Sequence, residues 1–259
     1  MFRLRPPGRT QFDSAASAVI DAMSVSMPAT DARKVVINNF ILALKAATIW
    51  DFLDVMYVPA AHAPSASLLN WKTPGTFTGV PVNSPSWQAD RGYTGNGTNS
   101  RVNTTWVPST NAVNYTLNNA AIWSWSPVNL QSDGYDIGIS SDANANRVEI
   151  NSWTSINRLS VRLNSTLGSF QATTSSQGLS GAQRVNSTTI TTWRNGVQGS
   201  SGGVVTTALP TLELWLCGVN ATSFGIRQIA FGAAGAALTG KELAFYSAIL
   251  AYMQAVGAA

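Results

Sequence analysis

The sequence contains few charged residues. Charged side chains make up 11% of its 259 residues, against roughly 25% in ordinary soluble domains. Ser, Thr and Asn supply polarity instead, while 45% of the residues are hydrophobic and nine are Trp. Disorder is not expected, because this much apolar surface can offset the entropy lost on folding. A weakly charged surface favours either an extracellular β-rich protein or a subunit of an assembly, where charges would have to be desolvated.

Cysteine and histidine are almost absent. Cys217 is the only cysteine and His62 the only histidine, which excludes an internal disulfide, a thiolate metal site and a histidine-based zinc shell. Cys217 lies in an apolar run and is expected to be a buried, inert thiol. No metal and no cofactor is predicted.

One segment has the alternating oxygen ligands of a calcium loop, at Asp142, Asn144 and Asn146. Arg147 stands where such a loop has Gly, and no bidentate Glu follows. We therefore favour a polar turn here, and a bound cation stays an open alternative.

Long hydrophobic runs are also missing. No stretch approaches the ~18 apolar residues of a membrane span, so membrane insertion is not expected. The first residues lack the apolar core of a signal peptide, which favours release by lysis if the protein acts outside a cell. The formal charge is only +4, with one cluster at Arg3, Arg5 and Arg9. Without a basic–aromatic motif, nucleic-acid binding is unlikely, and we interpret the cluster as an arm that docks on a neighbouring subunit.

What the sequence does contain is alternation. From about residue 87 to 235, apolar side chains recur at every second position, as in Tyr135, Ile137 and Ile139. Turn residues interrupt these runs about every ten residues, which is typical of a β-sandwich. Asn195-Gly196 is the dipeptide favoured by a tight type I′ hairpin. The fold class is therefore predicted to be mainly β, an antiparallel β-sandwich.

Helical patterns flank the sandwich. Apolar residues at helical spacing predict one helix over residues 10–25 and a second from Thr30, and Thr239 with Glu242 resembles a capping box before a final helix that ends near Gly257. The predicted organisation is an N-terminal arm and helical docking segment (1–54), a β-sandwich (55–238), and a C-terminal helix packed on it (239–259).

Several motifs resemble known proteins. Residues 91–104, 193–197 and 225–232 resemble segments of concanavalin A-like (laminin-G-like) jelly rolls. Three further phrases, at 50–57, 68–72 and 237–253, resemble a group of tailed-bacteriophage virion proteins with this jelly roll. The resemblance covers about residues 33–257. It implies a virion protein, assembled in the host cytoplasm, that contacts other virion proteins and copies of itself, and it carries over no catalytic residues.

Catalysis needs a separate test, because related folds host glycoside hydrolases and polysaccharide lyases. Glycosidases use two carboxylates roughly 5–9.5 Å apart, and no strand here carries acids at i and i+2 or i+4. No Ser lies in a nucleophile elbow. The alternative of an enzyme acting on host envelope polysaccharide therefore depends on isolated acids, with Glu149, Glu213 and Asp136 as the acid or base candidates.

Tryptophan is the remaining signal. Trp215 and Glu213 share one side of a strand, opposite the leucines, and Trp153 and Trp193 occur on other predicted strands. Exposed Trp beside amides and a carboxylate is suited to stacking on sugar rings. The candidate glycan-binding residues are Trp215, Glu213, Trp193 and Trp153, and core or interface positions stay the alternative for these tryptophans. The function that the sequence favours is a non-enzymatic structural or adhesive component of a tailed-phage virion, a tail or capsid appendage. Whether this appendage binds host-surface glycans or serves as an accessory subunit stays open.

Overall fold

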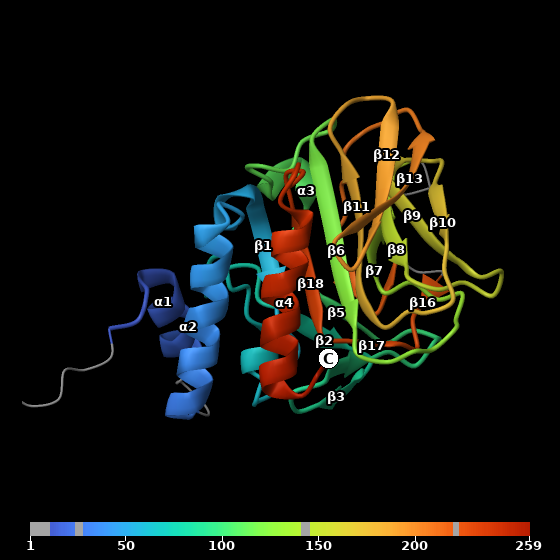
Figure 1. Cartoon of the computed structure of the whole chain (residues 1–259). Coiled ribbons are helices and arrows are strands. Elements are labelled where there is room, and N and C mark those ends of the chain that lie inside the picture. Colours follow the sequence, from blue (N-terminus) through green and yellow to red (C-terminus); the bar gives the residue numbers. More distant parts are fainter. Residues whose placement is uncertain (1–10, 24–27, 141–145, 220–222) are drawn as a thin grey trace, which may run out of the picture.

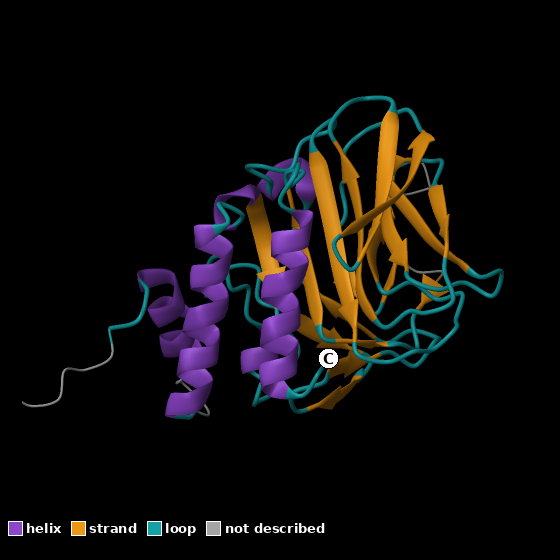
Figure 2. Ribbon diagram, viewed as in Figure 1, coloured by secondary structure: helices purple, strands orange, loops and turns teal. Residues whose placement is uncertain are grey.

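Alternating apolar side chains fold the middle of the chain into two stacked antiparallel sheets (Figures 1 and 2). The computed structural model describes residues 11–23, 28–140, 146–219 and 223–259. Sheet A has the order β1 (Leu53–Tyr57), β18 (Phe231–Gly235), β6 (Ala120–Ser126), β11 (Gly178–Arg184), β12 (Thr189–Arg194), β13 (Val197–Gly203). Sheet B has the order β10 (Ser169–Ala172), β9 (Arg158–Ser165), β8 (Arg147–Asn151), β7 (Ile137–Ser140), β14 (Trp215–Leu216), β5 (Arg101–Asn103), β2 (Val80–Val82). The predicted fold class is confirmed.

Smaller elements close the ends of the sandwich. A three-stranded sheet joins β3 (Ser86–Gln88), β4 (Gly92–Thr94) and β17 (Gln228–Ile229), and β15 (Gly218–Val219) pairs with β16 (Ser223–Phe224). The short helical turns are η1 (Trp50–Phe52), η2 (Ala66–Leu68) and α3 (Pro108–Asn111).

The space between the sheets is one hydrophobic core. Sheet A contributes Ile122 and Ile190, and sheet B contributes Ile137, Val148 and Val161, all with no exposed surface or almost none. Burying one such side chain stabilises a fold by roughly 1.5–3 kcal/mol. The side chains of the opposite parity on each strand therefore point away from this core.

A helical layer covers part of the outer face of sheet A. Helix α4 (Glu242–Val256) packs on β6 and β18, α2 (Asp31–Ala46) lies beside α4, and α1 (Ser14–Met23) packs on the far side of α2 (Figure 1). Aromatic rings join the layers: Phe245 of α4 lies 5.3 Å from Trp123 and 5.8 Å from Phe231 between ring centroids. The terminal helices thus complete a second hydrophobic core with the sandwich.

The helix boundaries confirm some sequence signals and correct others. The Thr30 side chain caps α2 by accepting from the Arg33 N–H at 3.2 Å, and Gly257 ends α4 with φ of 79°. Helix α1 begins at Ser14, later than predicted, and positions 10, 24 and 25 of the predicted range lie outside the described residues. The capping box was wrong: α4 begins at Glu242, its N-cap is Lys241, and no side chain caps it.

The predicted hairpin is confirmed and docks on α4. Asn195 and Gly196 have φ of 49° and 76°, the left-handed backbone that a type I′ turn requires. A Cβ on Gly196 would lie 2.9 Å from the Leu243 Cα. Because the turn touches α4 this closely, it fixes β12 and β13 relative to the start of that helix.

The remaining expectations concern metals and membranes. Cys217 is fully buried, and burial raises the pKa of its thiol, as expected of an inert cysteine. Asp142 and Asn144 lie outside the described residues, so the calcium question stays open there. Among the residues that are described, no three His, Cys, Asp or Glu side chains gather as metal ligands, and no helix is long and apolar enough to cross a membrane.

Candidate functional site

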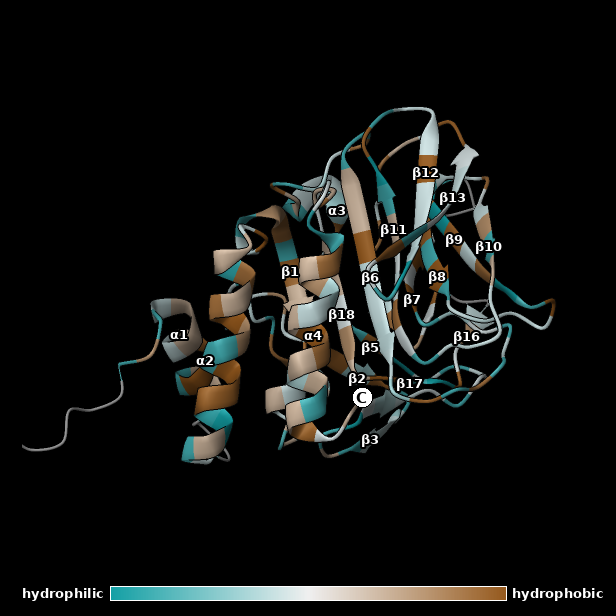
Figure 3. Cartoon of the chain, in the orientation of Figure 1, coloured by the Kyte–Doolittle hydropathy of each residue, from teal (hydrophilic) through white to brown (hydrophobic). Residues whose placement is uncertain are grey.

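The helices leave part of the outer face of sheet A uncovered. Every residue of β11 is buried, whereas β12 and β13, which continue the sheet beyond α4, carry half-buried and exposed residues (Figure 1). The side chains on their outer parity are mostly polar, and Figure 3 shows more hydrophilic ribbon in β12 and β13 than in β6 and β18. Thr191 and Trp193 pair there with Gln183 and Gly181 of β11. A polar sheet face therefore begins where the helical layer ends.

A groove runs along this boundary. It has a volume of about 310 Å³, at the lower end of the roughly 300–1,000 Å³ of small-ligand sites. We call it the β11–β13 groove. Its lining residues come from the three strands and from the turn before α4: Gln183, Val185, Thr189, Thr191, Trp193, Gln198, Thr239, Gly240 and Glu242.

Trp193 is the aromatic residue of the groove. Its strand partner on β11 is Gly181, where a Cβ would lie 2.0 Å from the Trp123 ring. With Gly181 lacking a side chain, Trp123 and Trp193 lie on the two neighbouring strands at the same level. Trp193 is half-buried. Its Nε1 is itself buried and has no hydrogen-bond partner in the described protein, so what the residue offers the groove is ring surface and not a donor.

Glu242 gives the groove its carboxylate. Only 5% of the Glu242 surface is exposed. Its Oε1 accepts a hydrogen bond from Gln183 Nε2 at 2.7 Å. The Gln183 Oε1 in turn accepts from the Leu238 N–H. Gln183 therefore holds the carboxylate against the sheet. This contact explains why Glu242 is not used to cap its own helix.

The chemistry of the groove is that of polar, non-covalent binding. It offers an indole surface, three threonine hydroxyls, two amides and one carboxylate. Such a set can stack on the apolar face of a sugar ring while bonding its hydroxyls. Glu242 is the only carboxylic acid among the described lining residues, whereas a glycosidase of the usual kind needs two.

The structure does not bring the four predicted glycan-binding residues together. Trp193 lies on sheet A, whereas Trp215 lies on β14 of sheet B and Glu213 just before it. A glycan site at Trp215 requires an exposed ring, and only 8% of the Trp215 surface is accessible. Its ring stacks on Phe224 at 6.3 Å, and the Arg101 guanidinium lies 3.8 Å from the ring centroid.

Glu213 and Trp153 each interact with a residue outside the groove. Burial lowers the pKa of Arg101, and attraction to Glu213 opposes that shift, so this acid lies within electrostatic range of the Arg101–Trp215 stack. Trp153 follows β8 and donates from Nε1 to Asn157 Oδ1 at 3.2 Å. Of the predicted set, only Trp193 lines the groove.

The other enzyme candidates are engaged in buried ion pairs. Asp136 is 1% exposed and pairs with Arg227 at 2.5 Å. Glu149 is fully buried and pairs with Arg162, with Arg147 3.6 Å away. Burial raises the pKa of Glu149, and the two arginines oppose the shift. Neither carboxylate lines the β11–β13 groove.

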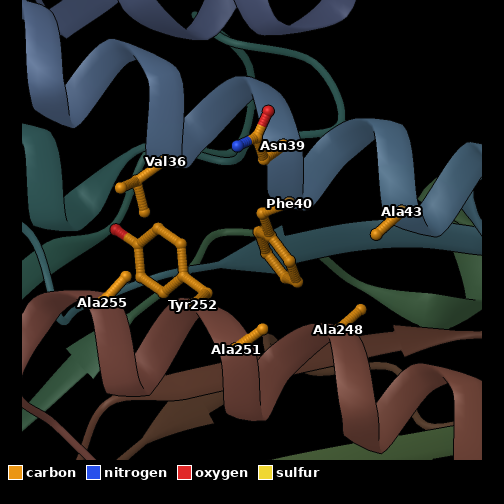
Figure 4. A pocket seen from close by; sticks show the side chains of 8 residues that line it. All are labelled: Val36, Asn39, Phe40, Ala43, Ala248, Ala251, Tyr252 and Ala255. Atoms are coloured by element: carbon orange, nitrogen blue, oxygen red, sulfur yellow. The ribbon is translucent and has the colours of Figure 1, made fainter.

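A second hollow lies between α2 and α4 (Figure 4). The Phe40 and Tyr252 rings lie 5.2 Å apart within it, and alanines form much of the α4 side. The Tyr252 hydroxyl donates to the Ala60 carbonyl at 3.0 Å. This is an apolar helix–helix contact surface, with little to direct a polar ligand.

Sequence reasoning missed most of the groove. Thr189, Thr191 and Trp193 share one parity of β12, and this spacing of hydroxyls and an indole was a readable signal. Glu242 had no such signal, because the sequence around it favours a helix cap. Its contact with Gln183 joins residues 59 positions apart.

No protein-family model and no curated protein matches this sequence. Among solved structures, the chain is similar to the botulinum neurotoxin serotype D binding domain, with 9% identity, a TM-score of 0.54, and coverage of 78% of this chain and 53% of that one. The serotype G binding domain gives 10% identity, a TM-score of 0.53, and coverage of 75% and 50%.

Trypanosoma rangeli sialidase is a more distant match, with 10% identity, a TM-score of 0.43, and coverage of 82% of this chain and 38% of that one. The chain thus spans about half the length of the toxin domains and less of the sialidase. The likeness shows the fold alone.

Proposed function

We propose that this protein is a non-enzymatic, adhesive binding module that holds a saccharide in the β11–β13 groove. The observation that carries the proposal is the partly exposed Trp193 ring flanked by Thr191, Gln198 and the buried Glu242 carboxylate. Directed hydroxyl and amide groups around an indole suit a ligand with one apolar face and many hydroxyls. The similar toxin domains are themselves described as binding domains, so a sandwich of this kind is compatible with the role.

The setting that we propose is the surface of a tailed-phage virion, as a tail or capsid appendage contacting host glycans. Support comes from the phage-like phrases in the sequence and from the low content of charge, which suits a subunit buried among others. Light scattering of the purified chain is expected to show more than one copy per particle. A strictly monomeric chain would count against the assembly part of the proposal.

A glycan array that carries neutral, amino and acidic oligosaccharides tests the binding role. We expect Trp193→Ala to weaken binding of every positive glycan about fivefold or more, because stacking is worth roughly 1 kcal/mol beyond area burial and ~1.4 kcal/mol is tenfold. Trp153→Ala is the matched control: it removes another half-buried Trp that does not line the groove. Equal losses in both variants, or no positive glycan, would overturn the proposal.

Turnover needs its own measurement. The groove contains a single described carboxylate, and the other acid candidates are paired with arginines. We therefore expect the positive glycans to be recovered intact after prolonged incubation. New reducing ends or unsaturated sugars that disappear in Glu242→Gln would instead establish an enzyme.

A further inference from the structure

In the described part of the chain, the lining of the β11–β13 groove contains one acidic side chain and no basic one. None of the described residues that line it is Lys, Arg or His, and Glu242 is its one ionisable side chain. Ligand sites for carboxylate, sulfate or phosphate groups ordinarily supply arginine or lysine donors. Hydroxyl and amide groups line this groove instead, beside an acceptor-only carboxylate.

The two arginines of β11 and β12 point away from the groove. Arg184 of β11 bonds through Nε and Nη2 to the Leu163 carbonyl, on the inner side of sheet A. Arg194 of β12 donates to the Ser175 and Gln177 carbonyls, and its strand partner Ser180 is also on the inner parity. Strand alternation therefore removes both arginines from the outer face.

The turn before α4 supplies no cation either. The Lys241 ammonium lies 5.8 Å from the Phe52 ring centroid, and Lys241 does not line the groove. An acidic sugar placed against Trp193 would meet Glu242 with no cation from the lining to offset the repulsion.

We propose that the groove selects saccharides that are neutral or carry ammonium groups, and rejects acidic ones. This inference depends on the proposed binding role. A neutral sugar donates its hydroxyls to Glu242 and to the amide oxygens. An amino sugar adds a charge-assisted bond to the same carboxylate, which is the stronger kind. Like-charge contact excludes uronic, sialylated and sulfated sugars.

The test compares three β-1,4-linked hexamers, one of N-acetylglucosamine, one of glucosamine and one of a uronic acid, against wild-type protein and Glu242→Gln. Gln at position 242 keeps an oxygen for the Gln183 bond, and thermal melting checks that the variant is folded. In the wild type we expect binding in the order glucosamine, N-acetylglucosamine, uronic acid, with at least about tenfold between the first and last. Glu242→Gln should reduce the preference for glucosamine over its acetylated counterpart.

A second variant adds the missing cation. Thr191→Lys places an ammonium on the outer parity of β12, next to Trp193 on that face. It should gain binding of the uronic acid hexamer and lose binding of the glucosamine hexamer.

The outcomes separate the two proposals. If glycans bind and Trp193→Ala abolishes binding, yet acidic ones are preferred by the wild type, the charge inference is overturned and the binding role stands. If Glu242→Gln and Thr191→Lys both leave the selectivity unchanged, the charge inference is overturned as well. If no hexamer and no array glycan binds in a Trp193-dependent way, both proposals are overturned.

Discussion

Arg227 is expected to be the most sensitive single position for stability. Its guanidinium is fully buried and makes a 2.5 Å ion pair with Asp136. It also donates to four backbone carbonyls and to one side-chain amide, those of Leu130, Ser132, Gly134, Trp153 and Asn151. One side chain thus ties the segment before β7 to the end of β8.

The substitution Arg227→Met retains much of the side-chain volume and removes the charge. Asp136 would then be a buried carboxylate without its partner, a change that costs about 3–5 kcal/mol. For a chain of this length, each kcal/mol lowers the melting temperature by roughly 2–4 °C, so a fall of roughly 6–20 °C is expected. Urea titration followed by circular dichroism measures the free energy of unfolding directly.

Two further variants make the result decisive. Arg158→Lys is the control, because Arg158 is only half-buried and lies over the Phe170 ring, 3.9 Å from its centroid. It should cost no more than about 1 kcal/mol. Adding Asp136→Asn to Arg227→Met should cost less than the sum of the single changes, because it removes the unpaired charge. A loss below 1 kcal/mol for Arg227→Met would refute the reasoning.

Three more predictions concern backbone and pH. Gly181→Ala should destabilise the fold by about 1–3 kcal/mol in urea titrations, because the new Cβ would overlap the Trp123 ring; wild-type stability would show that the ring can move. Gly196→Ala should cost about 1–3 kcal/mol, since φ is 76° and Leu243 is in contact, and unchanged melting would contradict the turn geometry. Burial lowers the pKa of Lys72 to about 8 from 10.5. The folded state therefore favours neutral Lys72, and stability relative to Lys72→Met should rise between pH 8 and 10.5; a flat difference would refute this.

The fold could be predicted because its signals are local. Alternation along β7 and β8 predicted which side chains face the core. The Asn195-Gly196 dipeptide predicted the hairpin turn, and Thr30 marked the start of α2. The site could be predicted only in part. Trp193 was identified, but whether a tryptophan is exposed depends on residues distant in sequence.

For Trp215 and Glu242, the environment of the side chain depends on residues distant in sequence. Phe224 and Arg101 cover the Trp215 ring, and Arg101 is more than a hundred positions away. Glu242 follows its tertiary partner Gln183 and not the local capping signal.

The indole N–H signals of ¹⁵N-labelled protein test the central claim most directly. They would be recorded during titration with the strongest binder from the glycan array, and assigned with Trp193→Phe, Trp153→Phe and Trp215→Phe. The Trp193 ring lines the groove, whereas Trp153 and Trp215 do not, so the Trp193 signal is predicted to shift on binding. The signals of Trp153 and Trp215 should stay in place. Shifts confined to those two, with Trp193 unmoved, would contradict a saccharide site in the β11–β13 groove.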